Sequence, residues 1–250
     1  LLSVKGFDIS ASKKADLLNY DYGWVVGLYL AEGSIGKYVI QFSLHKKEEV
    51  FAERIESFFT GLFGFKVGHY VYGNSRHCNV KDWNAPPLIT RFVLGHSART
   101  KHLSSESFQY GYEFLRGVID GWLAGDGHYE VVNQRYRLTI ARNPRLLTQL
   151  RMICRSLGYS FKSSDRLVKY QNGVKSAHQI EVRMIPLKRK DTNPFLASGK
   201  QALLLGQDLV ALKVKKVMRT QAQFFYDIEV EGEHTFATAD MVLTHNSNHM

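Results

Sequence analysis

Apolar residues recur at three- and four-residue spacing in two stretches of the chain, EEVFAERIESFFTGLFG at 48–64 and PRLLTQLRMICRSLG at 144–158. That period is typical of a helix that buries one face. Pro144 opens the second stretch, at a position where a helix tolerates the missing amide hydrogen. Strand-like runs at 37–46 and 135–141 precede the two helices. The hydrophobic pattern therefore predicts a strand followed by a helix, twice.

A helical stretch rich in small residues precedes each of these strand–helix pairs. Residues 27–33, GLYLAEG, align with residues 121–127, GWLAGDG, and both segments end with an acid and a glycine. The phasing continues beyond them, because Gly64 in LFGF and Gly158 in SLGY each fall 32 positions after their acid. Self-similarity at a fixed offset indicates a repeat. We therefore expect two tandem copies of one α-β-β-α-β-β unit.

Further strand candidates complete each copy, at 66–73 and 88–95 in the first and at 166–173 and 178–185 in the second. They alternate polar or basic residues with apolar ones, and Asn-Gly type turns predict hairpins. The expected fold class is α/β of the α+β type, with an antiparallel sheet in each pseudo-symmetric half. A two-stranded ribbon has the width to enter the major groove of DNA. An antiparallel sheet with one solvated face has the same pattern whatever it binds.

Glycines interrupt the helix before the second acid. Gly117, Gly121 and Gly125 recur every four residues, although each glycine inside a helix costs about 1 kcal/mol relative to alanine. Close packing against the first small-residue helix, through Gly27 and Ala31, would offset that cost, because small residues let two helix backbones approach. The sequence thus predicts a tight seam between the two helices.

Such a seam would bring Glu32 and Asp126 together at its end. Two neighbouring carboxylates repel and raise a pKa unless a cation lies between them. A hard divalent ion with oxygen ligands, Mg²⁺, suits the pair, and it can polarise a phosphodiester and activate water for attack. One acid-glycine pair alone is more often a helix-ending turn. Two copies in matched context favour a metal site at Glu32 and Asp126.

The net charge of the chain indicates which class of molecule it binds. The chain has a formal net charge of +10 and a pI near 9.5, which favours a polyanion such as nucleic acid, since Lys and Arg displace counterions from phosphates. The alternative is a solvated basic surface. Cys78 and Cys154 lack the spacing of a zinc site or a disulfide framework, which fits a reducing, cytoplasmic setting. No apolar run is long enough to cross a bilayer, so no membrane partner is expected.

The paired segments VVGLYLAEG (25–33) and GWLAGDG resemble the two motifs of the LAGLIDADG homing endonucleases, in the single-chain form with two halves. The resemblance covers about residues 17–200. It implies two αββαββα halves, about 17–105 and 106–205, whose saddle-shaped sheets bind double-stranded DNA as a pseudo-symmetric monomer. It also implies that Glu32 and Asp126 bind the metal and cleave one strand each. Glu32 replaces the usual aspartate of the motif.

A basic residue precedes the second motif. TKHLS at 100–104 is similar to a basic block of the same family, although Ser104 stands where the family has proline. The resemblance implies that Lys101 stabilises the charge that develops on the phosphate. A matching base in the second half is expected among Lys188, Arg189 and Lys190, for which a solvated surface is the alternative.

The end of the chain carries a second resemblance. YDIEVEGEHTFATADMVLTHNS at 226–247 resembles the closing blocks of an intein. Asparagine can cyclise on its own carbonyl to release the downstream segment, histidine moves protons near neutral pH, and a serine hydroxyl accepts an acyl group. The resemblance assigns these roles to Asn246, His245 with His234, and Ser247, with assistance from Asp227. Residues 206–246 would form the splicing segment and residues 247–250 the start of the host protein.

The opening blocks of an intein are not found in residues 1–20, and Leu1 cannot perform the first acyl shift. Residues 1–16 are therefore expected to be a linker or remnant, and splicing would require an N-terminal intein fragment as partner. Three functions stay open: a Mg²⁺-dependent homing endonuclease, a nucleic-acid-binding relative that cleaves nothing, and a split-intein half that splices in trans.

Overall fold

The computed structural model describes residues 13–170 and 173–184, with side chains for 19–169 and 173–184, and six further short strands as backbone. The chain divides into two compact units, residues 1–185 with 239–241 and residues 186–238 with 242–250. The boundary expected from the sequence, after residue 205, stays a prediction. Each unit is described by itself.

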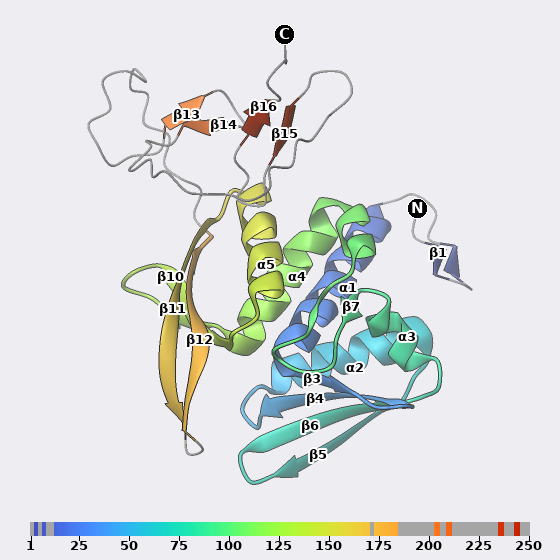
Figure 1. Cartoon of the computed structure of the whole chain (residues 1–250). Coiled ribbons are helices and arrows are strands. Elements are labelled where there is room, and N and C mark those ends of the chain that lie inside the picture. The colour runs from blue at the N-terminus through green and yellow to red at the C-terminus, as the bar shows by residue number, and fades with distance from the viewer. Residues whose placement is uncertain are drawn as a thin grey trace, which may run out of the picture. The chain divides into compact units, whose positions relative to one another are not determined.

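The first unit contains two copies of one succession of elements (Figure 1). The first copy consists of α1 (Lys13–Glu32), β3 (Gly33–Ile35), β4 (Val39–His45), α2 (Glu49–Phe63), β5 (Val67–Tyr72) and β6 (Ser75–Lys81). The second consists of α4 (Gly111–Asp126), β9 (His128–Glu130), β10 (Arg135–Ala141), α5 (Pro144–Ser156), β11 (Ser160–Tyr170) and β12 (Gly173–Arg183). Each copy has the predicted α-β-β-α-β-β order, with one strand of the first copy at another place in the chain than predicted.

Both copies build the same antiparallel sheet. The strand order is β3-β4-β6-β5 in the first sheet and β9-β10-β12-β11 in the second, and every neighbouring pair is antiparallel. These two sheets with their helices make the fold α+β, as expected. The linking segment carries α3 (Ala85–Thr90), β7 (Val93–Leu94), β8 (His102–Leu103) and a 3₁₀ turn, η1 (Ser105–Gln109).

The remaining described strands are short pairs. β1 (Ser3–Val4) pairs with β2 (Phe7–Asp8) in the first unit. In the second unit β13 (Leu203–Leu205) pairs with β14 (Leu209–Ala211), and β15 (Thr235–Ala237) pairs with β16 (Leu243–His245). No helix within the described residues has the length and apolar character needed to span a membrane.

The helical period of the sequence becomes the buried face of each covering helix. In α2 the spacing buries Ala52, Ile55 and Phe59, and in α5 it buries Leu150 and Ile153. These side chains belong to one hydrophobic cluster with the inward residues of both sheets. Because each helix covers one face of its sheet, the opposite face is left to polar residues.

One predicted strand is wrong. The sequence predicts extended backbone over residues 88–95, but α3 occupies Ala85–Thr90 and only Val93–Leu94 form a strand, β7. Two prolines lie in the first turn of α3, where their fixed φ favours a helix. The strand that completes the first sheet is instead β6, SRHCNVK, whose polar composition concealed it.

Candidate functional site

The helices α1 and α4 pack backbone against backbone. A Cβ added at Gly27 would overlap the carbonyl oxygen of Val118, and one added at Gly121 would overlap that of Trp24. Neither clash can be relieved by a side-chain rotation, because the obstacle is the backbone of the other helix. Glycine is therefore required at both positions for this approach.

The seam is longer than the sequence indicates. Gly117 lies against the backbone of Tyr20, as the four-residue spacing suggests, and Gly23 lies in the same way against the backbone of Phe114. Sequence reasoning missed Gly23, although it precedes Gly27 by the same four residues. That spacing was the available signal.

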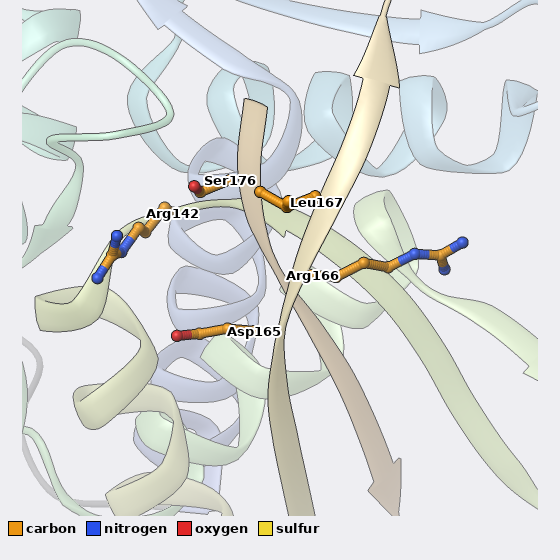
Figure 2. A pocket seen from close by; sticks show the side chains of 5 residues that line it. All are labelled: Arg142, Asp165, Arg166, Leu167 and Ser176. Carbon is orange, nitrogen blue, oxygen red and sulfur yellow. The ribbon is translucent and has the colours of Figure 1, made fainter. Parts of the chain in front are cut away.

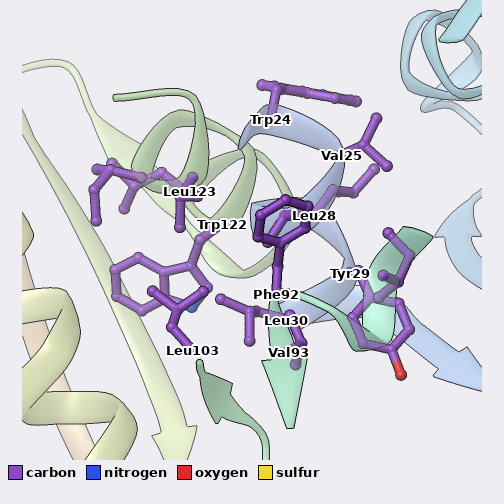
Figure 3. Close-up of a cluster of buried hydrophobic side chains, with 14 of the residues drawn as sticks. Trp24, Val25, Leu28, Tyr29, Leu30, Phe92, Val93, Leu103, Trp122 and Leu123 are labelled. Carbon is purple, nitrogen blue, oxygen red and sulfur yellow. The ribbon is translucent and has the colours of Figure 1, made fainter. Parts of the chain in front are cut away.

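Large apolar side chains line the seam and offset the weak helix preference of its glycines (Figure 3). Trp122 and Leu28 are fully buried, and Leu123 and Leu103 are almost so. Burial of one such side chain contributes about 1.5–3 kcal/mol, whereas each helical glycine costs about 1 kcal/mol. Packing therefore outweighs propensity in this pair of helices.

The seam ends at the two acids. Glu32 is the last residue of α1 and Asp126 is the last residue of α4. A Cβ added at Gly125 would lie 2.6 Å from Cβ of Ala31 and 3.1 Å from Cγ of Glu32. The side chain of Glu32 thus lies directly against the residue that precedes Asp126. The missing side chain at Gly125 leaves room for it.

The surroundings raise the pKa of both carboxyl groups. Burial, followed by the charges of Asp126 and Glu48, raises the pKa of Glu32 to about 7, and Lys101 opposes the rise. Asp126 keeps a solvent-exposed surface, but the protein around its carboxyl still raises its pKa to about 6, against Lys101 and a hydrogen bond with Trp122. A nearby cation would therefore stabilise the charged form of both acids.

Lys101 lies beside the acids and is only 4% exposed. Its ammonium donates to the carbonyl oxygens of Tyr29 at 2.9 Å, Gly33 at 2.5 Å and Leu30 at 3.4 Å. Carbonyls at the end of a helix have no partner within the helix, so Lys101 satisfies the C-terminal end of α1. Burial lowers the pKa of Lys101 to about 8, and the acids partly restore it.

The donor set at the seam end fits a hard divalent cation. Glu32 and Asp126 offer carboxylate oxygens, which Mg²⁺ prefers, and Mg²⁺ usually keeps several waters beside one or two carboxylates. Among the described residues, no group of three or more His, Cys, Asp or Glu side chains gathers to hold a metal by itself. Glu48 is held in the turn after β4, where it accepts a hydrogen bond from the amide of His45 at 2.7 Å.

Several predicted site residues lie outside the described residues: Lys188, Arg189, Lys190, Asp227, His234, Asn246 and Ser247. His245 is the last residue of β16 and pairs with Thr235 of β15. Only its backbone is described, so its role in splicing stays a prediction.

The solvated face of the first sheet carries a connected group of polar side chains that sequence reasoning missed. Gln41 Nε2 lies 3.2 Å from the Tyr70 hydroxyl and 3.1 Å from Nδ1 of His77. Ser43 Oγ lies 3.3 Å from the same nitrogen, and the rings of Tyr70 and His77 stack at 4.9 Å. Cross-strand register brings these residues together, which one strand's pattern cannot show.

The solvated face of the second sheet carries charged groups instead. Glu130 of β9 accepts from Arg135 Nε at 2.7 Å and from Arg137 Nη1 at 2.9 Å, and Arg135 Nη1 reaches Glu181 at 2.7 Å. Arg135 and then Arg137 hold the pKa of the Glu130 carboxyl down, at about 2. The alternation in RYRLTIA was the signal in the sequence, but the acidic partners come from other strands.

A small hollow of about 130 Å³ lies beside the second sheet, lined by Arg142, Asp165, Arg166, Leu167 and Ser176 (Figure 2). The side chain of Arg166 points away from those of Arg142 and Asp165. Asp165 is engaged with Nδ1 of His178 at 2.8 Å. The lining residues therefore do not converge on one point, in contrast to the end of the seam.

Comparison with protein families finds no matching family model. Among curated proteins, the chain is 32% identical over 126 residues to the DNA-directed RNA polymerase subunit Rpo1C of Methanocaldococcus jannaschii, which covers 49% of this chain and 14% of that protein. It is 26% identical over 263 residues to the ATP-dependent DNA helicase Hel308 of Thermococcus kodakarensis, covering 92% of this chain and 22% of the helicase. The chain spans less than a quarter of the length of these relatives.

Solved structures with a similar course of the chain include a mesophilic variant of the homing endonuclease I-DmoI, at 13% identity and a TM-score of 0.48, covering 67% of this chain and 91% of that one. I-DmoI in complex with DNA and Ca has 11% identity and a TM-score of 0.47, covering 67% and 84%. The N-terminal LAGLIDADG domain of DUF199/WhiA has 13% identity and a TM-score of 0.43, covering 73% and 89%.

Proposed function

We propose that the first unit is a site-specific DNA endonuclease of the LAGLIDADG type, which uses Mg²⁺ to hydrolyse one phosphodiester in each strand of a duplex. The observation that carries the proposal is the end of the seam. Two glycine-rich helices from matched copies finish side by side, with Glu32 against the residue before Asp126. Packing alone gives no reason to place two acids there, since each carboxylate makes ionisation of the other less favourable.

Glu32 and Asp126 would hold the cation. When bound, Mg²⁺ polarises the phosphodiester and lowers the pKa of water. The pKa values of both carboxyls are raised, so each carboxyl keeps its proton up to a higher pH than usual. A cation that binds there favours the charged carboxylate and releases that proton. Occupation of the site is therefore coupled to proton release, and the affinity for the cation should rise with pH.

Lys101 would act as a fixed positive charge beside the scissile phosphate. Its hydrogen-bonding capacity is taken up by the carbonyls of Tyr29 and Leu30 in the last turn of α1 and of Gly33 directly after it, because an ammonium has three donors. It therefore contributes through its charge, which favours the additional negative charge of the transition state. Lys188, Arg189 and Lys190 are the candidates for the same role in the second copy.

DNA binding falls to the solvated faces of the two sheets. The net charge of +10 supplies attraction to phosphates, and polar side chains on antiparallel strands can reach base edges in the major groove. Two copies in one chain allow each sheet to contact one half of the target. A single chain would then suffice to bind duplex DNA as a pseudo-symmetric monomer.

For the second unit the proposal is protein splicing in trans with an N-terminal intein fragment. Support comes from the closing residues, where Asn246 would cyclise, His245 and His234 would move protons with help from Asp227, and Ser247 would receive the acyl group. The chain also matches small shares of two larger proteins with different activities, a polymerase subunit and a helicase. A portable segment embedded in host proteins gives such a pattern.

A cleavage assay tests the nuclease. The full chain is incubated with a library of supercoiled plasmids carrying varied duplex targets, with Mg²⁺ and with EDTA. We expect linear product from a small subset of targets with Mg²⁺ only, and none from Asp126→Asn. Targets that are bound in a salt-dependent way but never cut would identify a binding protein and overturn the nuclease.

A mixing assay tests splicing independently. Addition of an N-terminal intein fragment should give a ligated product and release of the chain, and Asn246→Ala should block release. If neither ligation nor tail release occurs with a panel of such fragments, the splicing proposal fails while the nuclease proposal stands.

A further inference from the structure

The second sheet holds a chain of ion pairs that ends in a partly free arginine. Glu181 binds Nη1 of Arg135, Arg135 binds Glu130 through Nε, and Glu130 binds Nη1 of Arg137. Asn133 also donates to Glu130, at 3.0 Å. The side chain of Arg135 is 19% exposed, whereas that of Arg137 is 41% exposed. Arg135 is thus clamped between two acids, and Arg137 lies at the accessible end.

These groups lie on the face of the sheet that turns away from the core. Arg135 and Arg137 alternate along β10 with Leu138 and Ile140, which are buried. Cross-strand pairing places Glu130 opposite Arg135 and Glu181 opposite Arg137. The network therefore spans three adjacent strands of the solvated face, β9, β10 and β12, next to the turn between β9 and β10.

The guanidinium of Arg137 keeps one hydrogen-bonding edge available. Its ion pair with Glu130 uses Nη1, which leaves the Nε and Nη2 donors on the other edge. Two parallel donors at this spacing match O6 and N7 of guanine in the major groove, the commonest base-specific contact of arginine. Fixing one edge on Glu130 orients the other edge in advance, so less side-chain entropy is lost on binding.

The acids also argue against a simple phosphate contact. A side chain that serves only to neutralise phosphate gains nothing from a carboxylate beside it, because the carboxylate repels the DNA backbone. Glu130 and Glu181 reduce the general attraction of this face while they hold the arginines in place. Such an arrangement favours selectivity over raw affinity.

The first sheet has a different inventory at the same place. Its solvated face presents Gln41, Ser43, Tyr70 and His77 as a connected group without an ion pair among them. No arginine lies among the outward positions of its described strands β4, β5 and β6, because Arg76 turns inward to Glu49. Among the described strands of the two sheets, an arginine with a free two-donor edge on the solvated face is thus found in the second copy and not at the outward positions of β4, β5 and β6.

We propose that Arg137 is a specificity-determining residue that reads one guanine in the half of the DNA target covered by the second sheet, with Glu130 as its positioning residue. This inference rests on the proposed function of the first unit. It assigns a base contact to a named side chain and predicts an asymmetric target.

The test is selection of duplexes from a randomised library by the full chain, with subsequent measurement of the base preference at every position. Arg137→Lys keeps the charge and loses the two-donor edge. We expect it to lose a guanine preference of roughly ten- to hundredfold at one position, with the other positions unchanged. Glu130→Gln should weaken the same preference and raise affinity for random duplex.

Arg166→Lys is the matched control, an exposed arginine on the same sheet with no ion pair to another described residue. It should leave the position read by Arg137 unchanged. The assignment is overturned if Arg137→Lys keeps the guanine preference. It is also overturned if the variant loses base preference evenly at all target positions and its DNA affinity depends less on salt. If the wild-type chain selects no duplex, the proposed function itself has failed, and the two failures are thereby distinguished. Circular dichroism verifies that each variant is folded.

Discussion

The two copies share one frame and differ at their surfaces. Strand order, covering helix and small-residue seam are the same in both. The solvated face carries a connected group of uncharged amide and hydroxyl side chains with His77 in the first sheet and a network of ion pairs in the second, and the helix tips are Glu32 and Asp126. Interior packing tolerates little variation, whereas exposed positions are nearly free of that constraint. A duplicated fold can therefore keep its core and diverge in what it binds.

The largest expected effect concerns the two helix tips. Asp126→Asn and Glu32→Gln each remove one carboxylate while keeping the shape of the side chain. We expect each to reduce double-strand cleavage about a hundredfold or more, because cation binding and charge stabilisation are both lost. Separate quantification of nicked and linear plasmid shows whether the acids serve separate strands. Full linearisation by either variant would contradict the assigned site.

The seam predicts the next largest effect. Gly121→Ala places a methyl group on the carbonyl of Trp24, and such overpacking costs about 1–3 kcal/mol or more. Gly61→Ala, in α2, meets nothing within 4 Å and should stabilise the fold by about 0.5–1 kcal/mol through helix propensity. Urea unfolding of the two variants should give changes of opposite sign. Equal changes would mean that the helices do not pack this closely.

The smallest expected effect is a pH dependence without metal. The pKa values of Glu32 and Asp126 are raised to about 7 and about 6, so the folded state holds protons that the unfolded chain has lost. Stability from this source is complete below about pH 4 and is lost as the pH rises to about 7. The lowered pKa of Lys101 changes stability with pH only near and above pH 8, outside this range.

In EDTA, the midpoint temperature of thermal unfolding should therefore decrease as the pH is raised from about 4.5 to about 7. Comparison with Glu32→Gln separates this decrease from the contribution of the other carboxyl groups. Glu32→Gln should have a shallower fall than the wild type over this range. Added Mg²⁺ should raise the midpoint most at the upper end. If the midpoint of the wild type and that of the variant change with pH in parallel, the surroundings of Glu32 do not disfavour its charged form.

Local signals in the sequence accounted for much of the frame. Helical periodicity located α2 and α5, and the internal repeat located the two acid-tipped helices and their order among the strands. The misplaced strand at 88–95 had the opposite cause. Prolines turned an apolar segment into α3. β6 has few apolar residues because its outward positions are polar and one inward position is Arg76, which pairs with Glu49.

The sequence by itself determined the repeat, the helices and the presence of one acid at the end of each small-residue helix, because these are properties of neighbouring residues along the chain. Only the tertiary structure decided that Glu32 lies against Gly125, that Lys101 closes the end of α1, and that Glu130 holds Arg137. Each of these contacts joins residues from different elements. Their formation depends on how closely two backbones approach and on strand register, which are set by packing of the whole unit.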